Sequence, residues 1–269
     1  MPTMAELKSD ILFSLFKGEP GTRKSTAALS FPTPQYWVST DQKMSSLILP
    51  MKYWGVDAKQ VNYDDYTDYS KIRTKLEYLQ HTCPYKTVII DSITSVGDVT
   101  NRQTIKAKAG TTTQTGQEKG IRIGGISVNS LEDYKAEASA FQEMIALLKD
   151  IHNYHKVNVI LIAHVIGERK PADASQSTHF ARIIVTGGKI ISAKIPAYCE
   201  EVYHFNIEQE MESNKEGKYG LKTVHTGDDF ARTSLPLSQS ITFGNDPLYE
   251  KYIKPAITKR EQLQPTNQI

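Results

Sequence analysis

One segment near the N-terminus, GEPGTRKS at Gly18–Ser25, restricts the possible folds of this chain more than any other. It matches the pattern G-x-x-x-x-G-K-[ST] except at the sixth position. In that pattern, glycines let backbone N–H groups surround phosphates, the Lys contacts the outer phosphates, and the hydroxyl binds Mg²⁺. Gly18, Lys24 and Ser25 stand at their expected positions, but Arg23 replaces the second glycine. The segment predicts a phosphate-binding loop (P-loop) between a buried strand and a helix.

Arg23 raises the question of whether the loop keeps its shape. Glycine adopts a positive backbone dihedral φ freely, whereas a residue with a Cβ does so only at a cost. Because Arg23 precedes a predicted helix, we expect a negative φ and an intact loop. The guanidinium would then point outward, or place charge near the phosphates or at a subunit boundary. The motif predicts that ATP and Mg²⁺ are bound by Gly18, Glu19, Pro20, Gly21, Thr22, Arg23, Lys24, Ser25 and Thr26.

The size of the chain suits one large domain. It has 269 residues, of which 39% are hydrophobic and 23% charged, an ordinary composition for an α/β domain or a domain with appendages. We expect the main domain at residues 1–245 and a C-terminal helix with a polar tail at residues 246–269.

Charge, cysteine content and the N-terminal sequence bear on which partners, metal sites and cellular compartment to expect. A net charge of +2 does not by itself indicate a nucleic-acid partner, so any basic surface must be local. The two cysteines form no C-x-x-C pair, which argues against a disulfide framework or a zinc site. The first ten residues, MPTMAELKSD, lack a basic stretch followed by an apolar core, and no run in the sequence approaches about 18 apolar residues. We therefore expect a cytoplasmic protein without a membrane segment, in the host cytoplasm if a phage encodes it.

Short apolar runs alternate with helical periodicity along the chain. The runs have the length of buried strands, and the periodic segments place apolar residues on one helix face. Strands are expected at Ile11–Phe16, Gln35–Thr40, Lys86–Asp91 and Val157–Val165, and helices at Lys24–Ser30, Tyr69–Leu79 and Leu131–Ile151. This alternation predicts an α/β fold with a mostly parallel central sheet flanked by helices, and ligands beyond the carboxyl ends of the strands.

One acid at the end of a predicted strand supports the P-loop prediction. In P-loop hydrolases, a carboxylate at the end of a neighbouring strand holds the magnesium ion together with the hydroxyl of the loop. Asp91 ends the apolar run TVIID. Many strands end in a turn-forming Asp, but the combination with the P-loop favours a metal site at Ser25 and Asp91.

Two basic segments interrupt the alternation. Val99–Asn129 contains five Lys or Arg and a single acid, and Gly167–Lys189 follows the fourth predicted strand. We expect both to be long flexible loops on the same edge of the sheet as the P-loop. They either bind a partner or are solvated insertions. The candidate DNA-binding residues are Arg102, Lys106, Lys108, Lys119, Arg122, Arg169 and Lys170.

At TVIIDSITSV the chain resembles the RecA-like recombinases. Its layout is similar to that of phage nucleotide-binding proteins of the RecA-like class, including the Sak-type single-strand annealing ATPases. The matching motifs are GEPGTRKST, YWVSTD, TVIIDSIT and VILIAHV, with looser matches at GGKIISAKIPAYCEEVYHF and TGDDFARTSLP. They extend from Gly18 to Pro236, so the resemblance covers most of the chain and implies a RecA-like P-loop NTPase core.

The resemblance implies roles for four catalytic residues. Lys24 would contact the phosphates, and Asp41 would orient or deprotonate the attacking water, although family members commonly have Glu there. His164 would sense the γ-phosphate, and Arg232 would project into the nucleotide of a neighbouring subunit. Each of the last three has a plainer alternative: Asp41 as a turn or helix cap, His164 as a hydrogen-bonded core residue, and Arg232 as a solvated surface residue.

Three functions remain open. The first is a RecA-like ATPase that acts on single-stranded DNA in phage-type recombination, annealing or replication. Its partners would be single-stranded DNA, a single-strand-binding protein and further copies of itself in a ring or filament. The second is a small-molecule phosphotransferase, and the third a nonhydrolytic, nucleotide-gated interaction module. Asp91-Ser92 in TVIIDSITSV and the basic segments favour the first over the second. ATP consumption stimulated by single strands would exclude the third.

Overall fold

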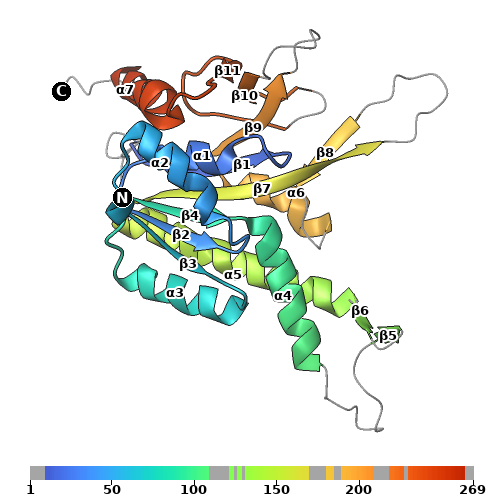
Figure 1. Ribbon diagram of the computed structural model, residues 1–269. Helices are drawn as coiled ribbons and strands as arrows, with labels where there is room; N and C mark the ends of the chain where they lie inside the picture. Colours follow the sequence, from blue (N-terminus) through green and yellow to red (C-terminus); the bar gives the residue numbers. More distant parts are fainter. Residues whose placement is uncertain are drawn as a thin grey trace, which may run out of the picture.

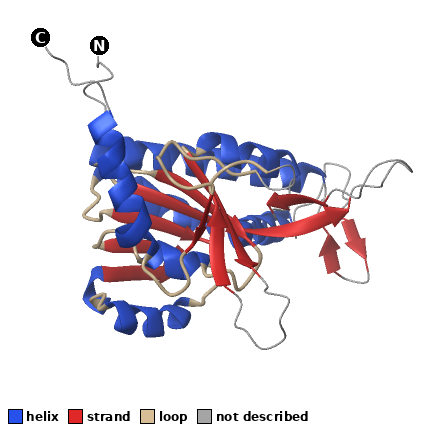
Figure 2. Cartoon of the chain, turned by 90° about the horizontal axis from the view of Figure 1, so that it is seen from above, coloured by secondary structure: helices blue, strands red, loops and turns tan. Residues whose placement is uncertain are grey.

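The computed structural model describes residues 10–108, 121–123, 126–128, 131–169, 180–184, 189–208, 218–226 and 230–263. A mostly parallel sheet carries helices on both faces (Figures 1 and 2). The strands are β1 (Phe13–Gly18), β2 (Gln35–Ser39), β3 (Val61–Asp65), β4 (Thr87–Asp91), β5 (Ile121–Ile123), β6 (Ile126–Val128), β7 (Asn158–Arg169), β8 (Phe180–Ile184), β9 (Glu201–Glu208), β10 (Lys218–Lys222) and β11 (Ser240–Thr242). The helices are α1 (Lys24–Leu29), α2 (Ile48–Trp54), α3 (Tyr69–His81), α4 (Ile93–Lys108), α5 (Leu131–His155), α6 (Lys189–Tyr198) and α7 (Lys254–Leu263), with short helical turns η2 (Met44–Leu47), η3 (Ala58–Gln60) and η4 (Tyr249–Ile253). Within these ranges, no helix combines the length and apolarity needed to cross a membrane.

The order of the strands determines which strand ends meet. The main sheet runs β11-β10-β9-β1-β7-β4-β2-β3, and β8 pairs with β7. The strands from β9 to β3 are parallel to their neighbours, whereas β10, β11 and β8 pair antiparallel. The predicted α/β class, a mostly parallel central sheet flanked by helices, is therefore confirmed.

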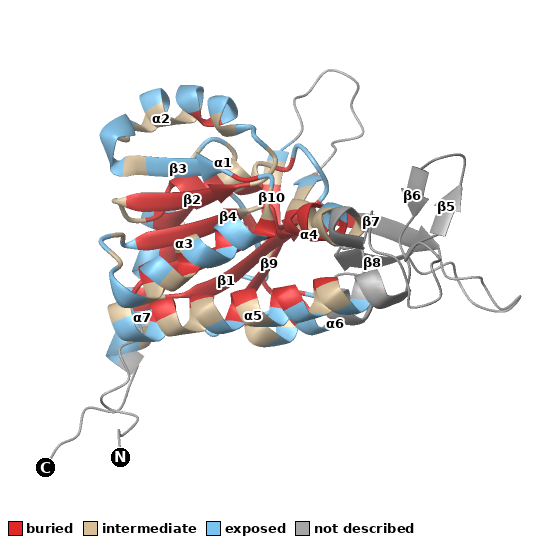
Figure 3. Cartoon of the chain, turned by 90° about the horizontal axis from the view of Figure 1, so that it is seen from below, coloured by how far each residue is buried: buried red, intermediate tan, exposed pale blue. Residues whose placement is uncertain are grey.

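A hydrophobic core lies on each face of the sheet because successive strand residues point to opposite faces. In β7, Val159 and Leu161 belong to the core covered by α3, α4, α5 and α6. Ile160 and Ile162 belong to the core covered by α1, η2, η4 and α7. Figure 3 shows that the central strands are buried and that exposed residues lie on the outer surfaces of α2 and α3. The unbroken apolar run of this strand reflects burial on both sides.

The predicted strands correspond to β1, β2, β4 and β7, and the predicted helices to α1, α3 and α5. Strands β3, β9, β10 and β11 were not predicted. The residues of β3, VNYDD, are mostly exposed at the edge of the sheet, so they carry no apolar alternation that a sequence pattern could detect.

The prediction that Val99–Asn129 is a flexible loop is wrong for its first part. Helix α4 continues through Val99 to Lys108, and β5 and β6 form a two-stranded antiparallel sheet. Val99 packs in the core, and the hydroxyls of Thr100 and Thr104 donate to carbonyls four residues earlier. Helix α4 was missed because Val99–Asn129 is rich in Thr and Lys, and because the helix begins at Ile93, before this segment. Residues 109–120 lie outside the described residues.

The prediction of a loop at Gly167–Lys189 is also wrong in part. Strand β7 continues to Arg169 and pairs antiparallel with β8, and α6 begins at Lys189. Residues 170–179 and 185–188 lie outside the described residues.

The C-terminal segment packs into the same core as α1. Leu248 and Ile253 are fully buried there, and the backbone N–H of Tyr249 donates to Ser30 Oγ at 2.9 Å. The helix predicted after Asp246 is thus present as η4 and α7, and it covers one face of the sheet. The predicted polar tail at residues 264–269 lies outside the described residues.

Candidate nucleotide-binding site

The carboxyl ends of four parallel strands bring the predicted site residues to one edge of the sheet. Gly18 at the end of β1 is aligned with His164 in β7. Asp91 at the end of β4 is aligned with Ile162 of β7 on one side and with Ser39 of β2 on the other. This edge is where α/β sheets bind their ligands.

The P-loop leaves β1 at a position that accepts only glycine. A Cβ on Gly18 would lie 2.4 Å from the carbonyl oxygen of Phe205 in β9, which is too close. Gly21 has a φ of 83°, in the region that favours glycine. The hydroxyl of Thr22 donates to the carbonyl oxygen of Glu19 at 2.8 Å and closes the turn. The close approach of Phe205 to Gly18 and the hydrogen bond of Thr22 therefore help to shape this loop.

Arg23 has φ 63° and ψ 27°, so the prediction of a negative φ is wrong. The left-handed conformation is the one that a glycine would adopt freely, and it costs another residue about 1–2 kcal/mol. Followed by a helical residue, it turns successive N–H groups toward one concave space, as in anion-binding nests. The loop thus keeps its backbone shape in spite of the substitution.

The guanidinium of Arg23 points away from the loop, which was one of the expected orientations. It lies 3.9 Å from the ring centre of Tyr219 in β10, and Nη1 donates to the Gly244 carbonyl oxygen at 3.1 Å. Nη1 also donates to the side chain of Asn245. The positive charge therefore contacts the C-terminal strands.

Lys24 is the buried cation of the site. Its side chain turns back onto the loop, where Nζ donates to the carbonyl oxygens of Gly18 and Glu19, each at 2.8 Å. The residue is 4% exposed. Burial lowers the pKa of Lys24 to about 8, although the negative charges of Asp91, Asp41 and Glu19 oppose this shift. The ammonium group is thus held, partly desolvated, beside the two predicted acids.

Ser25 and Asp91, the two predicted metal ligands, meet in the structure. The Ser25 side chain lies close enough to the Asp91 carboxylate to affect its ionisation. Burial raises the pKa of Asp91, and the polar side chain of Ser25 opposes this shift. A cation would favour the ionised form of this carboxylate. A hydroxyl and a carboxylate are a suitable pair of ligands for Mg²⁺, which commonly completes its coordination with phosphate oxygens and water.

Asp41 is held by a group of hydroxyls and by His164. Ser95 Oγ and Ser92 Oγ donate to its carboxylate, Ser92 at 3.2 Å, and His164 Nε2 lies 3.4 Å from Oδ2. Burial would raise the pKa of Asp41, but the hydrogen bonds from His164 and Ser95 and the charges of His164 and Lys43 lower it to about 2. The helical turn η2 that follows begins after Lys43, without a side-chain cap. Asp41 therefore does not cap it.

His164 lies between the P-loop and Asp41. Its backbone N–H donates to Thr94 Oγ1 at 3.0 Å, and its side chain is 25% exposed. Nδ1 is buried without a hydrogen-bond partner among the described residues. A satisfied core histidine would have a partner for both ring nitrogens, so this environment fits a group that contacts a further ligand.

A family model described as an AAA domain matches residues 14–235, which include most of β1 and all of the P-loop, β4 and β7. The chain belongs to this AAA-domain family. It is a nucleotide-binding P-loop domain, and the family consists generally of ATPases.

Two solved structures resemble the chain remotely. A KaiC-like protein from the hyperthermophilic archaeon Pyrococcus horikoshii OT3 is 15% identical, with a TM-score of 0.43 over 80% of this chain and 86% of that one. The RadB recombinase is 13% identical, with a TM-score of 0.46 over 82% of this chain and 84% of that one. Among curated proteins, no match to the sequence is found.

In this AAA-domain protein, Arg232 lies apart from the residues that cluster around the P-loop. Its backbone pairs with Val202 of β9, and its guanidinium donates to the carbonyl oxygens of Pro196 at 3.2 Å and of Cys199, at the end of α6. Val202 is aligned with Leu15, three residues before the end of β1. The Arg232 side chain thus caps α6 of its own chain and is not part of the cluster around the P-loop.

The predicted DNA-binding residues are only partly described. Arg102 is exposed on α4, and its Nε donates to the Asp98 carbonyl oxygen at 3.3 Å. The backbones of Lys106 and Lys108 are in α4, that of Arg122 is in β5 and that of Arg169 is in β7, while their side chains lie outside the described residues. Lys119 and Lys170 lie wholly outside them.

A hollow of about 410 Å³ borders the P-loop and was not predicted. It is lined by Arg23, Thr26, Ser46, Leu49, Pro50, Tyr53, Trp54 and Asn245. Sequence patterns miss it because α2 contributes exposed apolar residues, Leu49 and Tyr53 among them, that belong to no motif. Ser95 and Thr40 were also missed. Thr40 Oγ1 donates to the Ser92 carbonyl oxygen at 3.0 Å and joins the ends of β2 and β4.

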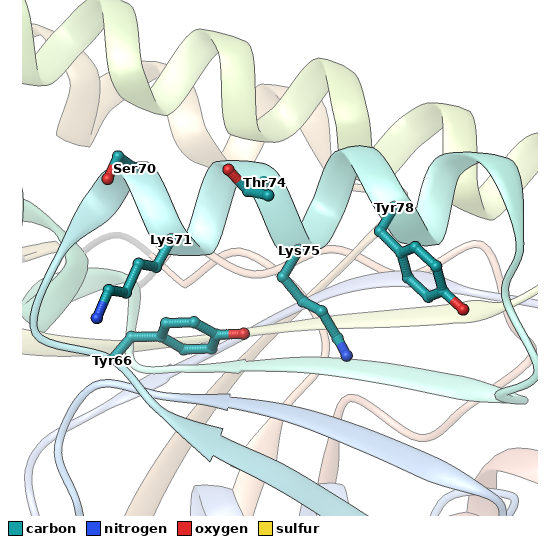
Figure 4. A pocket seen from close by; sticks show the side chains of 6 residues that line it. All are labelled: Tyr66, Ser70, Lys71, Thr74, Lys75 and Tyr78. Atoms are coloured by element: carbon teal, nitrogen blue, oxygen red, sulfur yellow. The ribbon is translucent and has the colours of Figure 1, made fainter.

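A second hollow, of about 550 Å³, lies on α3 beside the edge strand β3. It is lined by Tyr66, Ser70, Lys71, Thr74, Lys75 and Tyr78. Lys71 and Lys75 extend from the helix on either side of the Tyr66 ring (Figure 4). None of the predicted site residues lines it.

The lowered pKa of Lys24 predicts that nucleotide binding takes up a proton in alkaline solution. With a pKa of about 8, free Lys24 is charged at about pH 7 and mostly neutral at about pH 9, and anionic phosphates favour the charged form. Binding of Mg-ATP should take up close to one proton at the higher pH and almost none at the lower. Calorimetry in buffers of different ionisation heat measures this uptake.

Lys24→Arg is the control for this measurement, because a guanidinium remains charged at both pH values. The uptake should disappear in this variant. An equal uptake by both proteins would show that another group titrates.

Proposed function

We propose that this AAA-domain protein binds Mg-ATP at the carboxyl edge of the sheet and hydrolyses it. The observation that carries the proposal is the convergence of Lys24, Ser25, Asp91 and Asp41 beside the P-loop. These four residues come from the ends of three strands, β1, β2 and β4, so only the folded sheet assembles them. A set of groups with these chemistries suits the β- and γ-phosphates, their metal ion and a water molecule.

Each residue has a distinct part in this proposal. The Lys24 ammonium exchanges its loop carbonyls for phosphate oxygens, and Ser25 and Asp91 bind the metal ion. Bound Mg²⁺ would neutralise charge that develops on the phosphates. A carboxylate with a pKa of about 2 is a weak proton acceptor at neutral pH. Asp41 therefore orients the attacking water rather than deprotonating it, and His164 holds Asp41 in place.

The base and sugar of the nucleotide would occupy the hollow beside Arg23. Its lining includes Arg23 of the P-loop, Thr26 of α1, and Tyr53 and Trp54 of α2. Aromatic side chains bind the face of a base by stacking.

Replacing two acids should separate metal binding from catalysis. Asp91→Asn should weaken the dependence of ATP binding on Mg²⁺, because the metal loses an anionic ligand. Asp41→Asn should leave Mg-ATP affinity within about threefold and reduce turnover about a hundredfold, since only water activation is affected. Calorimetric titration and steady-state phosphate release provide the two measurements.

Asp65→Asn is a matched control for both variants. Asp65 ends β3 and accepts a hydrogen bond from Ser39, outside the cluster. Normal turnover in Asp41→Asn would place water activation elsewhere, with the neighbouring Gln42 as the next residue to replace. Tight Mg-ATP binding without turnover in the unaltered protein would favour the nonhydrolytic interaction module.

We further propose that the ATPase acts on single-stranded DNA in phage-type recombination, annealing or replication, as the Sak-type resemblance implies. Two features support this. Helix α4, which carries Arg102, begins directly after Asp91 and Ser92, and β7, which carries Arg169, continues beyond His164. Both elements thus extend from the carboxyl edge of the sheet, at the ends of β4 and β7, and Figure 1 shows where α4 and β8 lie in the fold. Further copies of the chain and a single-strand-binding protein are the proposed protein partners.

Removal of basic residues from α4 tests this DNA role. Replacing Arg102, Lys106 and Lys108 with Ala should weaken single-strand binding. The slope of the logarithm of the binding constant against the logarithm of the salt concentration should become shallower by roughly two to three units, because fewer counterions are released. Basal ATPase activity should persist, but its stimulation by DNA should be lost. Binding is measured at several salt concentrations.

A control variant removes the same charge from other surfaces: Lys59, Lys71 and Lys259, all exposed, are replaced with Ala. It should keep the slope of the unaltered protein. Equal slopes and affinities for all three proteins would show that the basic segment Val99–Asn129 is only a solvated insertion. The role would then pass to Arg169 and Lys170, or the protein would have no DNA ligand.

A further inference from the structure

The side chain of Arg23 joins the P-loop to a separate part of the fold. It contacts Tyr219 in β10 and Gly244 and Asn245, which follow β11. We name β10, β11 and the turn Gly244–Asn245 the C-terminal layer. In Figure 1 this layer lies near α1 and α7, on the far side of β9 from β7.

The groups that contact the Arg23 guanidinium are held in place by hydrogen bonds of their own. The carbonyl oxygen of Tyr219 accepts hydrogen bonds from the N–H groups of Phe243 and Gly244, at 3.0 and 3.1 Å. The carbonyl oxygen of Asn245 accepts one from Trp54 Nε1 at 2.9 Å. The ring and the two acceptors that meet Arg23 are therefore fixed relative to one another and to α2.

The backbone of Arg23 determines where the phosphate-binding groups lie. It has the left-handed conformation, which an arginine adopts only when its surroundings hold it. Its carbonyl oxygen accepts the hydrogen bond from Ala27 N–H at 2.9 Å that begins α1. Lys24 and Ser25 are the next two residues. A shift of the Arg23 peptide would therefore move both of them.

We propose that Arg23 is a positioning residue that couples the P-loop to the C-terminal layer. The contacts of its guanidinium hold the loop in the shape that binds phosphate, so the layer raises the affinity for Mg-ATP. Because coupling between two parts of a protein is reciprocal, bound Mg-ATP also stabilises the layer. The inference rests on the proposed function, since it requires that the P-loop binds Mg-ATP.

Two substitutions at Arg23 separate the backbone from the side chain. Arg23→Gly removes the contacts but adopts the left-handed conformation freely, whereas Arg23→Ala removes the contacts and keeps the cost of a Cβ. Mg-ATP should bind about tenfold more weakly to Arg23→Ala than to Arg23→Gly. Equal affinities of these two variants would contradict the proposed positioning of the loop.

A double-mutant cycle with Tyr219 tests the coupling itself. Tyr219→Leu removes the ring from the guanidinium and should weaken Mg-ATP binding about fivefold in the unaltered background. In the Arg23→Gly background the same change should have almost no effect, because the contact is already absent. A Tyr219 that merely stabilises the fold would weaken binding equally in both backgrounds. Asn245→Ala replaces Tyr219→Leu in the cycle if the latter does not fold.

Tyr252→Leu is the matched control. Tyr252 lies on η4, its hydroxyl donates to the Thr242 carbonyl oxygen of β11 at 3.2 Å, and its ring contacts Lys251 rather than Arg23. This variant loses a ring and a cation contact beside the same layer. Its effect on Mg-ATP binding should be the same with Arg23 and with Gly at position 23.

Hydrogen exchange provides a readout that does not depend on affinity. Saturating Mg-ATP should slow amide exchange in β10 and β11 of the unaltered protein and leave it unchanged in Arg23→Gly. Two results would overturn this inference and leave the proposed function standing, provided that the unaltered protein binds Mg-ATP tightly. One is that the effects of the Arg23 and Tyr219 substitutions on affinity are additive. The other is that Mg-ATP leaves amide exchange in β10 and β11 unchanged. Failure of the unaltered, folded protein to bind Mg-ATP would overturn the proposed function and this inference with it.

Discussion

The buried ammonium group of Lys24 is the interaction on which the site depends. A charge that is removed from water needs compensation, and here two loop carbonyls and the nearby Asp91 and Asp41 supply it. These partners come from three segments that are distant in sequence. They meet because β1, β4 and β2 are parallel, with β7 between β1 and β4, so that their carboxyl ends share one edge. The sheet order thus creates the electrostatic environment of the loop.

The elements that could be predicted from the sequence are those buried on both sides or on one clear face. The apolar runs of β1, β4 and β7 and the helical periodicity of α3 and α5 report burial directly, and their ends identified the P-loop, Asp91 and His164. The edge strand β3 gave no such signal because most of its residues are exposed. Helix α4 was missed for another reason: beyond Val99 it contains so many Thr and Lys that its sequence resembles a loop.

The error at Arg23 has a different physical origin. Local sequence indicates that a residue before a helix should have a negative φ, and the expectation ignored contacts with the C-terminal segment. Those contacts, with Tyr219, Gly244 and Asn245, come from residues about two hundred positions away. No pattern near the loop contains them. The same limitation explains why the hollow formed by α2, Arg23 and Asn245 was missed.

The most direct test of the central claim is the affinity for Mg-ATP of the unaltered protein and of Lys24→Ala, measured by calorimetry on samples with the same circular dichroism spectrum. The phosphates replace loop carbonyls as partners of the Lys24 ammonium. The account predicts tight binding by the unaltered protein and loss of tight binding in the folded variant. Equal Mg-ATP affinity of the two folded proteins would contradict it.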